Sequence, residues 1–369
     1  MSSDLTEEQG ELVSFLRSLL AQRSDSAAVR AAMASADGWD RALWRVLCEE
    51  IGAASLAIPE EFGGAGFTAV ETHLVLEELG YALTPSPYLA SVGIAAPALL
   101  ASGAAAACER VLPGIADGSS IATLAWADAA GNFDPVTTAV TARQQDGWVL
   151  DGESPLVLDG LAADVVLAIA QTPGGPGLFL VDAAASVERV ATPALDPTLR
   201  LATLRFDGTP AELLSSETAV FETTRTAALS AIAALQTGAA ARGLDMTVTY
   251  AGQRRQFGRL IGSFQALKHR MADMHVRVET ARTASRAAAR AIAEDAPEAA
   301  EAAALAKSWC GESLDLVAGE TIQLHGGIGI TWEHDAHLVF KRAHALRQLF
   351  GTPERQRERL AVELGLVPR

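Results

Sequence analysis

The long helical patterns from residue 216 to the C-terminus constrain the fold more than any other feature of the chain. Apolar residues at helical spacing, with many alanines among them, cover Ser216–Gln253, Ser263–Ala293, Pro297–Leu324 and Asp335–Phe350, and a short pattern covers Pro353–Leu364. Patterns of about thirty residues are far longer than the usual helix of ~11–12 residues. Helices of that kind are stabilised mainly by packing their apolar faces together. The segment therefore predicts a four-helix bundle followed by a short helix.

The pattern changes to short strands in the middle of the chain. Between Ser120 and Phe206 the apolar segments are short and rich in Val, Leu and Thr, and Gly, Pro and Asp separate them. The candidate strands are Ile121–Trp126, Thr138–Arg143, Trp148–Leu150, Val165–Ala170, Gly177–Val181 and Leu199–Phe206. Thr172–Gly177 predicts a hairpin tip, because its Pro and Gly residues favour a turn. Strands and helices do not alternate, so we expect a middle antiparallel β domain and no doubly wound parallel sheet.

The first third of the chain predicts a helical domain. Thr6 followed by Gln9 forms a capping-box pattern, and the apolar residues after it follow helical spacing. Further helices are predicted over Asp40–Gly52, Thr68–Tyr81 and Tyr88–Ala107. We therefore expect an α+β multidomain protein with an N-terminal α-helical domain (1–117), a middle β domain (118–215) and a C-terminal helical bundle (216–369).

Composition narrows the classes of partner. Lys and Arg number 29 against 45 Asp and Glu, which gives a net charge of −16. Nucleic acid and anionic membrane surfaces both need a basic face, so neither is expected as a partner. No uncharged apolar run reaches the ~18 residues of a membrane span, and the acidic, polar start does not resemble a secretory signal. We expect a cytoplasmic protein whose three widely spaced cysteines are reduced thiols, without a disulfide framework or a metal site.

Two segments of the C-terminal part carry candidate ligand-binding residues. Gln253–Gly258 places two arginines beside a glycine after a long helix, which suits bidentate binding of a phosphate. The same arginines also suit a helix C-terminus, where cations interact favourably with the helix dipole. Gln323–Ile330 contains the run His-Gly-Gly-Ile-Gly, which either lets backbone N–H groups approach a pyrophosphate or simply ends a helix. The residues alone leave both alternatives open.

Taken in order, four segments resemble the signatures of the acyl-CoA dehydrogenase family, and the resemblance extends over nearly the whole chain. Leu56–Gly66 is similar to the Pro-Glu-Glu-Tyr-Gly-Gly turn of the family's N-terminal domain, and Asp146–Leu167 is similar to a segment of its β domain. Arg254–Met274 resembles the RxxFG signature with the Gln and Ala-Asp-Met that follow it, and Gln323–Gly329 resembles QxxGGxG. The resemblance implies the α-β-α order of domains that the patterns predict.

The resemblance also implies an FAD enzyme that desaturates an acyl-CoA thioester between Cα and Cβ. In the family, a carboxylate takes the α proton, FAD takes the β hydride, and electron transfer flavoprotein is the usual electron acceptor. The FAD straddles a subunit interface, where one subunit holds the flavin ring and the other holds the adenosine end. The residues that match the adenosine side are Arg254, for the pyrophosphate, Phe257 beside it, and Gln265, Gln323, Gly326 and Gly327.

The family's catalytic base has no counterpart in this sequence. The usual base is the Glu of a Tyr-Glu-Gly-Thr motif, and Phe350 holds that position in Leu349–Thr352. Some members place the base on the first long helix of the C-terminal domain, where this chain has Ala228, or just before a Gln-x-Gly of that helix, where it has Leu235. None of the three side chains can accept a proton, so we assign no catalytic residue.

The segment that faces the flavin ring in the family has changed as well. The Lys-x-Trp-Ile-Thr stretch of the family reads Ser154–Leu158 here, with Leu156 in place of the tryptophan and Leu158 in place of the hydroxyl residue. Leucine neither stacks as an aromatic ring nor donates a hydrogen bond, and Pro155 has no backbone N–H. The residues that act within their own subunit are therefore lost, whereas those that act across the interface are kept.

This asymmetry predicts that the chain is the non-catalytic subunit of a heteromeric acyl-CoA dehydrogenase. In this respect it resembles one of the two subunits of actinobacterial α2β2 enzymes, which act on bulky CoA esters such as those of steroid side chains. The FAD ring, the base and the acyl-CoA substrate would belong with a homologous catalytic subunit. The alternatives are a self-sufficient homomeric dehydrogenase with a relocated base at Glu222 or Asp245, a flavin-free structural homologue, and an oxidase on the same fold.

Overall fold

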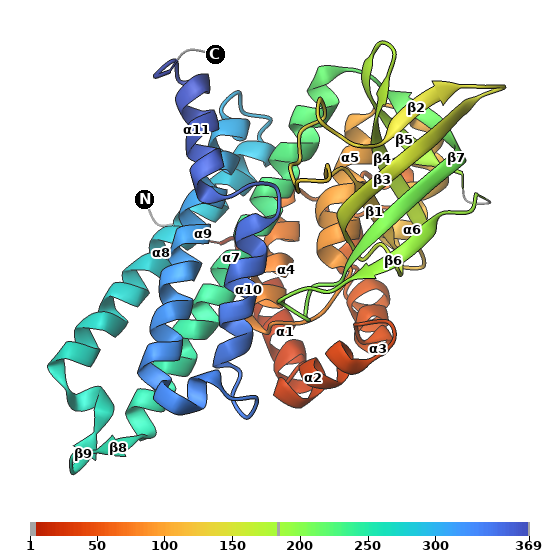
Figure 1. The fold of residues 1–369 in the computed structure, drawn as a ribbon. Coiled ribbons are helices and arrows are strands. Elements are labelled where there is room, and N and C mark those ends of the chain that lie inside the picture. The colour runs from red at the N-terminus through yellow and green to blue at the C-terminus, as the bar shows by residue number, and fades with distance from the viewer. Residues whose placement is uncertain (1–4, 183–184, 368–369) are drawn as a thin grey trace. The chain divides into compact units, whose positions relative to one another are not determined.

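The computed structural model describes residues 5–182 and 185–367, and its ribbon is drawn in Figure 1. The chain divides into two compact units, each of which gathers segments that are distant in sequence. The first, here called the bundle unit, contains the chain up to Ala34, residues 73–85 and the chain from Leu229 on. The second, the sheet unit, contains residues 35–72 and 86–228. The domain boundaries at residues 117 and 215 follow changes of sequence pattern and stay predictions.

Long helices form the bundle unit, as the sequence predicts. They are α1 (Glu7–Arg23), α2 (Ser26–Ala34), most of α4 (Ala69–Tyr81) and of α7 (Thr218–Gln253), α8 (Gln265–Ala293), α9 (Ala299–His325), α10 (Ala336–Gln348) and α11 (Pro353–Glu363). Helix α9 packs against α8, α10 and α11 (Figure 1). The capping box of α1 is confirmed, because Thr6 Oγ1 accepts from the Gln9 N–H at 3.2 Å and Gln9 Oε1 accepts from the Thr6 N–H at 3.1 Å. Among the described residues, no helix is both long and apolar enough to span a membrane.

Small residues let the helices of the bundle unit approach one another closely. Gly238 of α7 lies against α4, where a Cβ would come within 1.9 Å of the Glu77 carbonyl oxygen. Gly243 of α7 lies against α9, where a Cβ would come within 2.9 Å of Thr321 Oγ1. Thr247 Oγ1 also donates to Thr321 Oγ1 at 3.2 Å. These contacts fix α7 against α9, and so they fix the helix ends that carry both candidate ligand-binding segments.

A seven-stranded sheet of described residues forms the centre of the sheet unit. Its strands are β1 (Ala122–Ala125), β2 (Thr141–Gln144), β3 (Trp148–Leu158), β4 (Val165–Thr172), β5 (Gly175–Val181), β6 (Glu188–Thr192) and β7 (Leu201–Ser215). The order is β1-β4-β2-β3-β7-β5, and β6 pairs with β7. Because β5 also pairs with β4, the pairings close into a ring, as in a small barrel. Leu150, Ala168 and Phe179 lie in the buried core of this unit.

Most strand pairings are antiparallel, as predicted, but β1–β4 and a single residue pair of β2–β4 are parallel. Strand β1 joins the sheet at the edge beside β4, and the β2–β3 hairpin lies between the two in sequence, which lets both run in the same direction. The predicted hairpin tip is confirmed, since Thr172 pairs with Gly175 between β4 and β5. The sequence does not predict β6, whose residues are mostly exposed.

Short helices complete the sheet unit. They are α3 (Arg41–Arg45), η1 (Val46–Glu50), η2 (Ala53–Ser55), η3 (Glu60–Phe62), η4 (Leu89–Ala95), α5 (Ala96–Ala101) and α6 (Ala105–Ala116). The single helix predicted over Tyr88–Ala107 is wrong, because it starts as the π-helix η4 and a turn separates α5 from α6. Gly103 in that turn has φ +67°, a left-handed conformation that ends a helix.

Candidate functional site

The RxxFG segment folds into a small hairpin directly after α7. Strand β8 (Arg255–Gln256) pairs with β9 (Arg259–Leu260), and Phe257 and Gly258 form the two-residue turn between them. Both turn residues have positive φ, +52° and +78°, as a type I′ turn requires. The Phe257 ring is 91% exposed and meets the Phe264 ring edge-on, with 6.1 Å between the ring centroids. The hairpin thus projects an aromatic ring from the end of the bundle unit.

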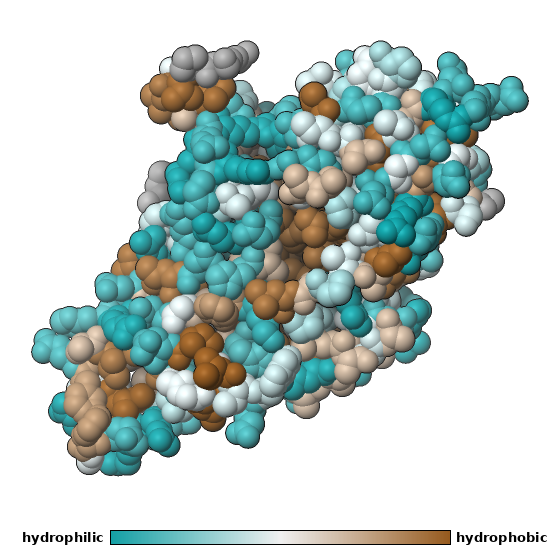
Figure 2. Space-filling model, viewed as in Figure 1, coloured by the Kyte–Doolittle hydropathy of each residue, from teal (hydrophilic) through white to brown (hydrophobic). Residues whose placement is uncertain are grey.

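Two unpaired cations flank the start of this hairpin. Arg254 and Arg255 are exposed, and neither forms an ion pair with another described residue. The backbone of Arg254 is fixed, because its N–H donates to the Tyr250 carbonyl oxygen at 2.8 Å and its carbonyl oxygen accepts from the Ile261 N–H at 2.8 Å. In the view of Figure 2, hydrophilic and hydrophobic atoms are mixed over this end of the bundle unit. Two free guanidinium groups beside an exposed ring suit an anionic ligand that also has an apolar face.

The glycine-rich segment forms the 3-10 turn η6 (Gly326–Ile330) directly after α9. Gly326 has φ +62° and ψ −142°, a conformation that residues other than glycine rarely adopt. A Cβ on Gly326 or Gly327 would meet no atom within 4 Å, whereas a Cβ on Gly329 would lie 3.0 Å from the Ile322 carbonyl oxygen. Packing within the described chain therefore explains the glycine at 329 but not the one at 327. The bare backbone at Gly326–Gly327 leaves room for a ligand or another chain.

An aromatic contact brings the two segments together. Tyr250, one helical turn before Arg254, stacks on His325, which directly precedes Gly326. The ring centroids are 4.5 Å apart and the planes are 28° from parallel. His325 is therefore a link between the ends of α7 and α9.

The two candidate glutamines lie near helix ends and are exposed. Gln265 is the first residue of α8, and Gln323 lies in the last turn of α9. Neither side chain forms a hydrogen bond with another described residue. Both amide groups are therefore free to bind a ligand, since an amide offers two donors and one acceptor.

The three positions considered for a catalytic base are buried and apolar. Ala228 and Leu235 lie on α7, Phe350 follows α10, and none of them is more than 7% exposed. Phe350 has φ +57°, and its carbonyl oxygen accepts a hydrogen bond from Gln356 Nε2 at 2.7 Å. The turn at Phe350 thus has a fixed left-handed backbone, and its side chain cannot take a proton.

The two carboxylates considered as relocated bases are engaged with neighbours. Glu222 Oε1 lies 3.3 Å from a guanidinium nitrogen of Arg225. Asp245 Oδ2 accepts a hydrogen bond from the Tyr81 hydroxyl at 2.8 Å. Each carboxylate therefore has a polar partner within its own unit.

The segment that matches the flavin-ring positions lies at the end of β3. Its pairing with β7 is irregular between Ser154 and Val157, and Leu156 in this bulge has φ +58°. Leu158 is buried, and Ser154 Oγ donates to the Ala127 carbonyl oxygen at 3.0 Å. The bulge therefore offers aliphatic side chains where the family has an aromatic ring and a hydroxyl group.

A buried carboxyl group that the sequence does not predict, that of Asp159, follows this bulge. Asp159 is buried with φ +51°, and burial raises its pKa to about 7, although the positive charge of Arg200 lowers it. The only local signal is the Asp-Gly pair that it forms with Gly160, and this pair predicts a turn without predicting burial.

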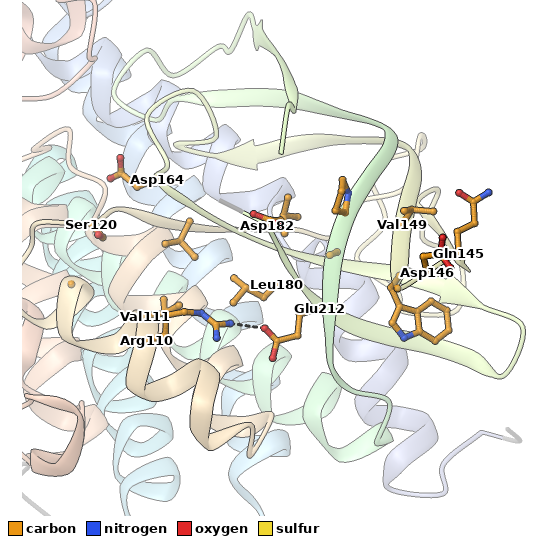
Figure 3. Close-up of a pocket in the computed structure, with 17 residues that line it drawn as sticks. Arg110, Val111, Ser120, Gln145, Asp146, Val149, Asp164, Leu180, Asp182 and Glu212 are labelled. Carbon is orange, nitrogen blue, oxygen red and sulfur yellow. Dashed lines mark hydrogen bonds and ion pairs between the residues drawn. The ribbon is translucent and has the colours of Figure 1, made fainter. Parts of the chain in front are cut away.

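A separate cavity of about 660 Å³ lies in the sheet unit (Figure 3). Its walls come from α6, the β2–β3 turn and strands β5 and β7, and an ion pair between Arg110 and Glu212 crosses it. Asp146, Asp164 and Asp182 make the remaining polar lining acidic. None of the adenosine-side or base positions lines this cavity, so it is distinct from the candidate site.

Comparison with known proteins identifies the family. Residues 6–119 match the family described as acyl-CoA dehydrogenase, N-terminal domain, and residues 220–365 match acyl-CoA dehydrogenase, C-terminal domain. Acyl-CoA dehydrogenase IpdE2 of Mycobacterium tuberculosis is 43% identical over 98% of this chain and 99% of its own length. IpdE2 of Mycolicibacterium smegmatis is 40% identical over 98% of this chain and 100% of its own length.

Solved structures share the whole architecture. A chain of a variant of the steroid ACAD Tcur3481–Tcur3483 is 33% identical, with a TM-score of 0.90 and 98% of both chains covered. A chain of the ChsE4–ChsE5 complex from Mycobacterium tuberculosis is 31% identical, with a TM-score of 0.91 and 100% of both chains covered. The chain described here belongs to the acyl-CoA dehydrogenase family and has that family's fold of N-terminal helices, middle β domain and C-terminal bundle.

Proposed function

We propose that this chain is the base-lacking subunit of a heteromeric, FAD-dependent acyl-CoA dehydrogenase and contributes the adenosine and pyrophosphate side of the FAD site. The observation that carries the proposal is an asymmetry within one chain. The Arg254 side chain is exposed and forms no ion pair with another described residue, and Gly326 and Gly327 are exposed at positions where a Cβ would meet no atom within 4 Å. The three base positions, by contrast, hold buried apolar side chains. This asymmetry supports a role in which the chain contributes one side of the FAD site and a homologous subunit contributes the base.

The adenosine side of the chain fits a dinucleotide. The guanidinium group of Arg254 suits bidentate binding of a phosphate, and a glycine turn lets backbone N–H groups approach a pyrophosphate. Phe257 is exposed to an extent that is unusual for an aromatic ring, and a bound ligand or a second subunit would cover it. The exposed amides of Gln265 and Gln323 add hydrogen-bonding groups on nearby helix ends.

The flavin-ring side of the chain does not fit a flavin. Leu156 and Leu158 can neither stack as aromatic rings nor donate hydrogen bonds, and Pro155 between Ser154 and Leu156 has no N–H. A bound FAD would supply the hydride acceptor for an acyl-CoA, and a carboxylate would be needed to take the α proton. Because the described positions that match the family's ring contacts and base carry aliphatic or aromatic side chains, we assign the ring contacts and the base to a homologous subunit.

The relatives support a heteromer with a bulky substrate. Two of the solved relatives above 30% identity are a steroid ACAD named for two chains and the ChsE4–ChsE5 complex. We extend these features to this chain and propose an α2β2 assembly that acts on a bulky acyl-CoA such as a steroid side-chain ester. Electron transfer flavoprotein is the acceptor that we propose for the assembled enzyme.

The test is to purify the chain alone and after co-expression with a homologous acyl-CoA dehydrogenase chain that has a Glu at one of the base positions. We expect the lone chain to be colourless, and we expect the co-purified complex to show flavin absorption and to reduce a dye with an acyl-CoA as donor. A lone chain with stoichiometric FAD that oxidises an acyl-CoA would overturn the proposal in favour of a self-sufficient enzyme. A complex without flavin would favour a structural homologue, and oxygen consumption in place of dye reduction would indicate an oxidase.

A further inference from the structure

Three aromatic side chains meet where the end of α7, the end of α9 and the segment before α10 come together in the bundle unit. Tyr250 stacks on His325 with 4.5 Å between ring centroids, and His325 meets His334 at 4.4 Å. Tyr250 and His334 also contact each other edge to face at 6.4 Å. Each ring therefore touches both others, and we call this group the Tyr-His-His stack.

The backbone ties this stack to both candidate ligand-binding segments. The Arg254 N–H donates to the carbonyl oxygen of Tyr250 at 2.8 Å, so a displacement of Tyr250 displaces Arg254. His325 is the last residue of α9 and directly precedes the glycine turn. His334 Nδ1 accepts from the Ala336 N–H at 3.1 Å, which anchors the third ring to the start of α10. The stack thus joins the end of α7 to the segment between α9 and α10, which is distant from it in sequence.

The surroundings of the stack favour neutral imidazole rings. His325 is 3% exposed, and its Nε2 has no hydrogen-bond partner among the described residues. Burial lowers the pKa of both His325 and His334. The charged groups that act on His334 or on its neighbour His337 of α10 are Arg30 of α2, Arg242 of α7, Lys341 of α10 and Asp335. Arg30 forms an ion pair with Asp335 at 2.7 Å. Cations predominate in this set, so a proton on the stack would meet repulsion as well as the penalty of burial.

We propose that the Tyr-His-His stack positions Arg254 and Gly326–Gly327 as one anion-binding face, and that acid uncouples the two segments. Since the rings contact one another, we assign them a positioning role. The coupling follows from the geometry of the chain alone. Only the identity of the anion, the diphosphate of a dinucleotide, rests on the proposed function.

Hydrogen–deuterium exchange of the full-length chain tests the coupling without any ligand. At neutral pH, we expect His325→Ala to reduce the protection of backbone amides by about tenfold in both residues 254–261 and residues 326–331, because the contact between the segments is lost. His325→Phe keeps a ring between Tyr250 and His334 and is expected to restore protection in both segments. The matched control is His344→Ala, an exposed histidine of α10, which should leave both segments unchanged.

Acid provides the second arm of the test. At about pH 5, below the ordinary histidine pKa of ~6.5, we expect protection of both segments to fall in the wild type. The double variant His325→Phe/His334→Phe cannot titrate there and should keep its protection. Equal protection in wild type and His325→Ala at neutral pH, or a loss confined to one segment, would overturn the inference. Failure of the proposed function would show differently, as a flavin content of the complex that does not depend on Arg254.

Discussion

At the scale of single residues, Asp159 gives the clearest pH dependence. Burial raises the pKa of this carboxyl group from 3.8 to about 7, while Arg200 opposes the shift. A carboxyl group whose pKa is raised in the folded state favours folding below its unfolded pKa, and this contribution is lost as the pH rises through the folded pKa. The native state is therefore penalised above about pH 7, where the buried carboxylate carries a charge.

Asp159→Asn is expected to raise the free energy of unfolding by about 1–3 kcal/mol at pH ~8, because the amide stays neutral where the carboxylate would be charged. Asparagine also tolerates the left-handed φ of +51° at this position. The gain should shrink toward pH ~5, where the carboxyl group is largely protonated. Urea unfolding at the two pH values measures the difference. The matched control is Asp146→Asn, since Asp146 also has positive φ but is exposed. If Asp159→Asn raised the free energy of unfolding equally at both pH values, the argument would be contradicted.

Sequence patterns indicate candidate site residues but not the contacts around them. The RxxFG and QxxGGxG signatures indicate Arg254 and Gly326 as ligand-binding residues, and this assignment stays a prediction. The structure adds that both are exposed and that their helix ends adjoin. No local pattern predicts that His325 stacks on Tyr250, because this contact depends on how α7 and α9 are aligned. Burial of Asp159 also depends on packing between segments that are distant in sequence, so no local pattern predicts it.

At the scale of helices and strands, replacing glycine by alanine is expected to have opposite effects on stability at two positions. A Cβ on Gly238 of α7 would lie 1.9 Å from the Glu77 carbonyl oxygen of α4, whereas a Cβ on Gly319 of α9 would meet nothing within 4 Å. Gly238→Ala is expected to lower the free energy of unfolding by about 1–3 kcal/mol or more, because one of the helices must move. Gly319→Ala should raise it by up to about 1 kcal/mol, because alanine has the higher helix propensity. Denaturant unfolding of the two variants checks both signs, and a change of the same sign in both would refute the packing argument.

The helices of the bundle unit could be predicted more accurately than the strands of the sheet unit. The predicted helix Ser216–Gln253 differs from α7 only by the position of its first residue. Its long apolar period is a local signal, whereas strand limits depend on partners distant in the chain. The Asp-Gly pair at Asp207 predicts a turn, yet strand β7 continues through it to Ser215. It does so because β3 and β5 pair with it on both sides. Strand β6 is missed because it is short, polar and mostly exposed.

At the scale of the whole molecule, net charge and ligand chemistry point in different directions. A chain with a net charge of −16 repels polyanions at long range, yet the proposed ligand is a dinucleotide. The conflict is resolved locally, because many arginines are neutralised by carboxylates, as Arg347 is by Asp315, whereas Arg254 and Arg255 are not. Overall charge therefore reports on the class of bulk partner, whereas the proposed binding of a small anion depends on a few unpaired cations.

The proposed division of labour between subunits sets the expected flavin stoichiometry. If each FAD site combines the adenosine side of one subunit with the ring side of a homologue, an α2β2 assembly contains two complete pairings with this chain as the adenosine side. The reciprocal pairing would place the flavin ring on the Leu156–Leu158 bulge, which offers neither an aromatic ring nor a hydroxyl group. We therefore expect two FAD per α2β2 complex and not four. Flavin absorbance compared with the mass of the complex from light scattering measures this ratio.

Both of those sites use the same arginine, so one substitution should empty them together. Arg254→Ala removes charge-assisted hydrogen bonds worth about 1.5–3 kcal/mol, which corresponds to roughly 10–100-fold weaker binding of FAD. Arg290→Ala, at an exposed arginine of α8, is the matched control and should leave the flavin content unchanged. Light scattering must show an intact α2β2 complex for both variants, so that loss of flavin is not loss of assembly. Four FAD per complex would mean that this chain holds the flavin ring itself, and the self-sufficient alternative would then replace the proposed subunit. Full flavin content in Arg254→Ala would contradict the pyrophosphate-binding role proposed for Arg254.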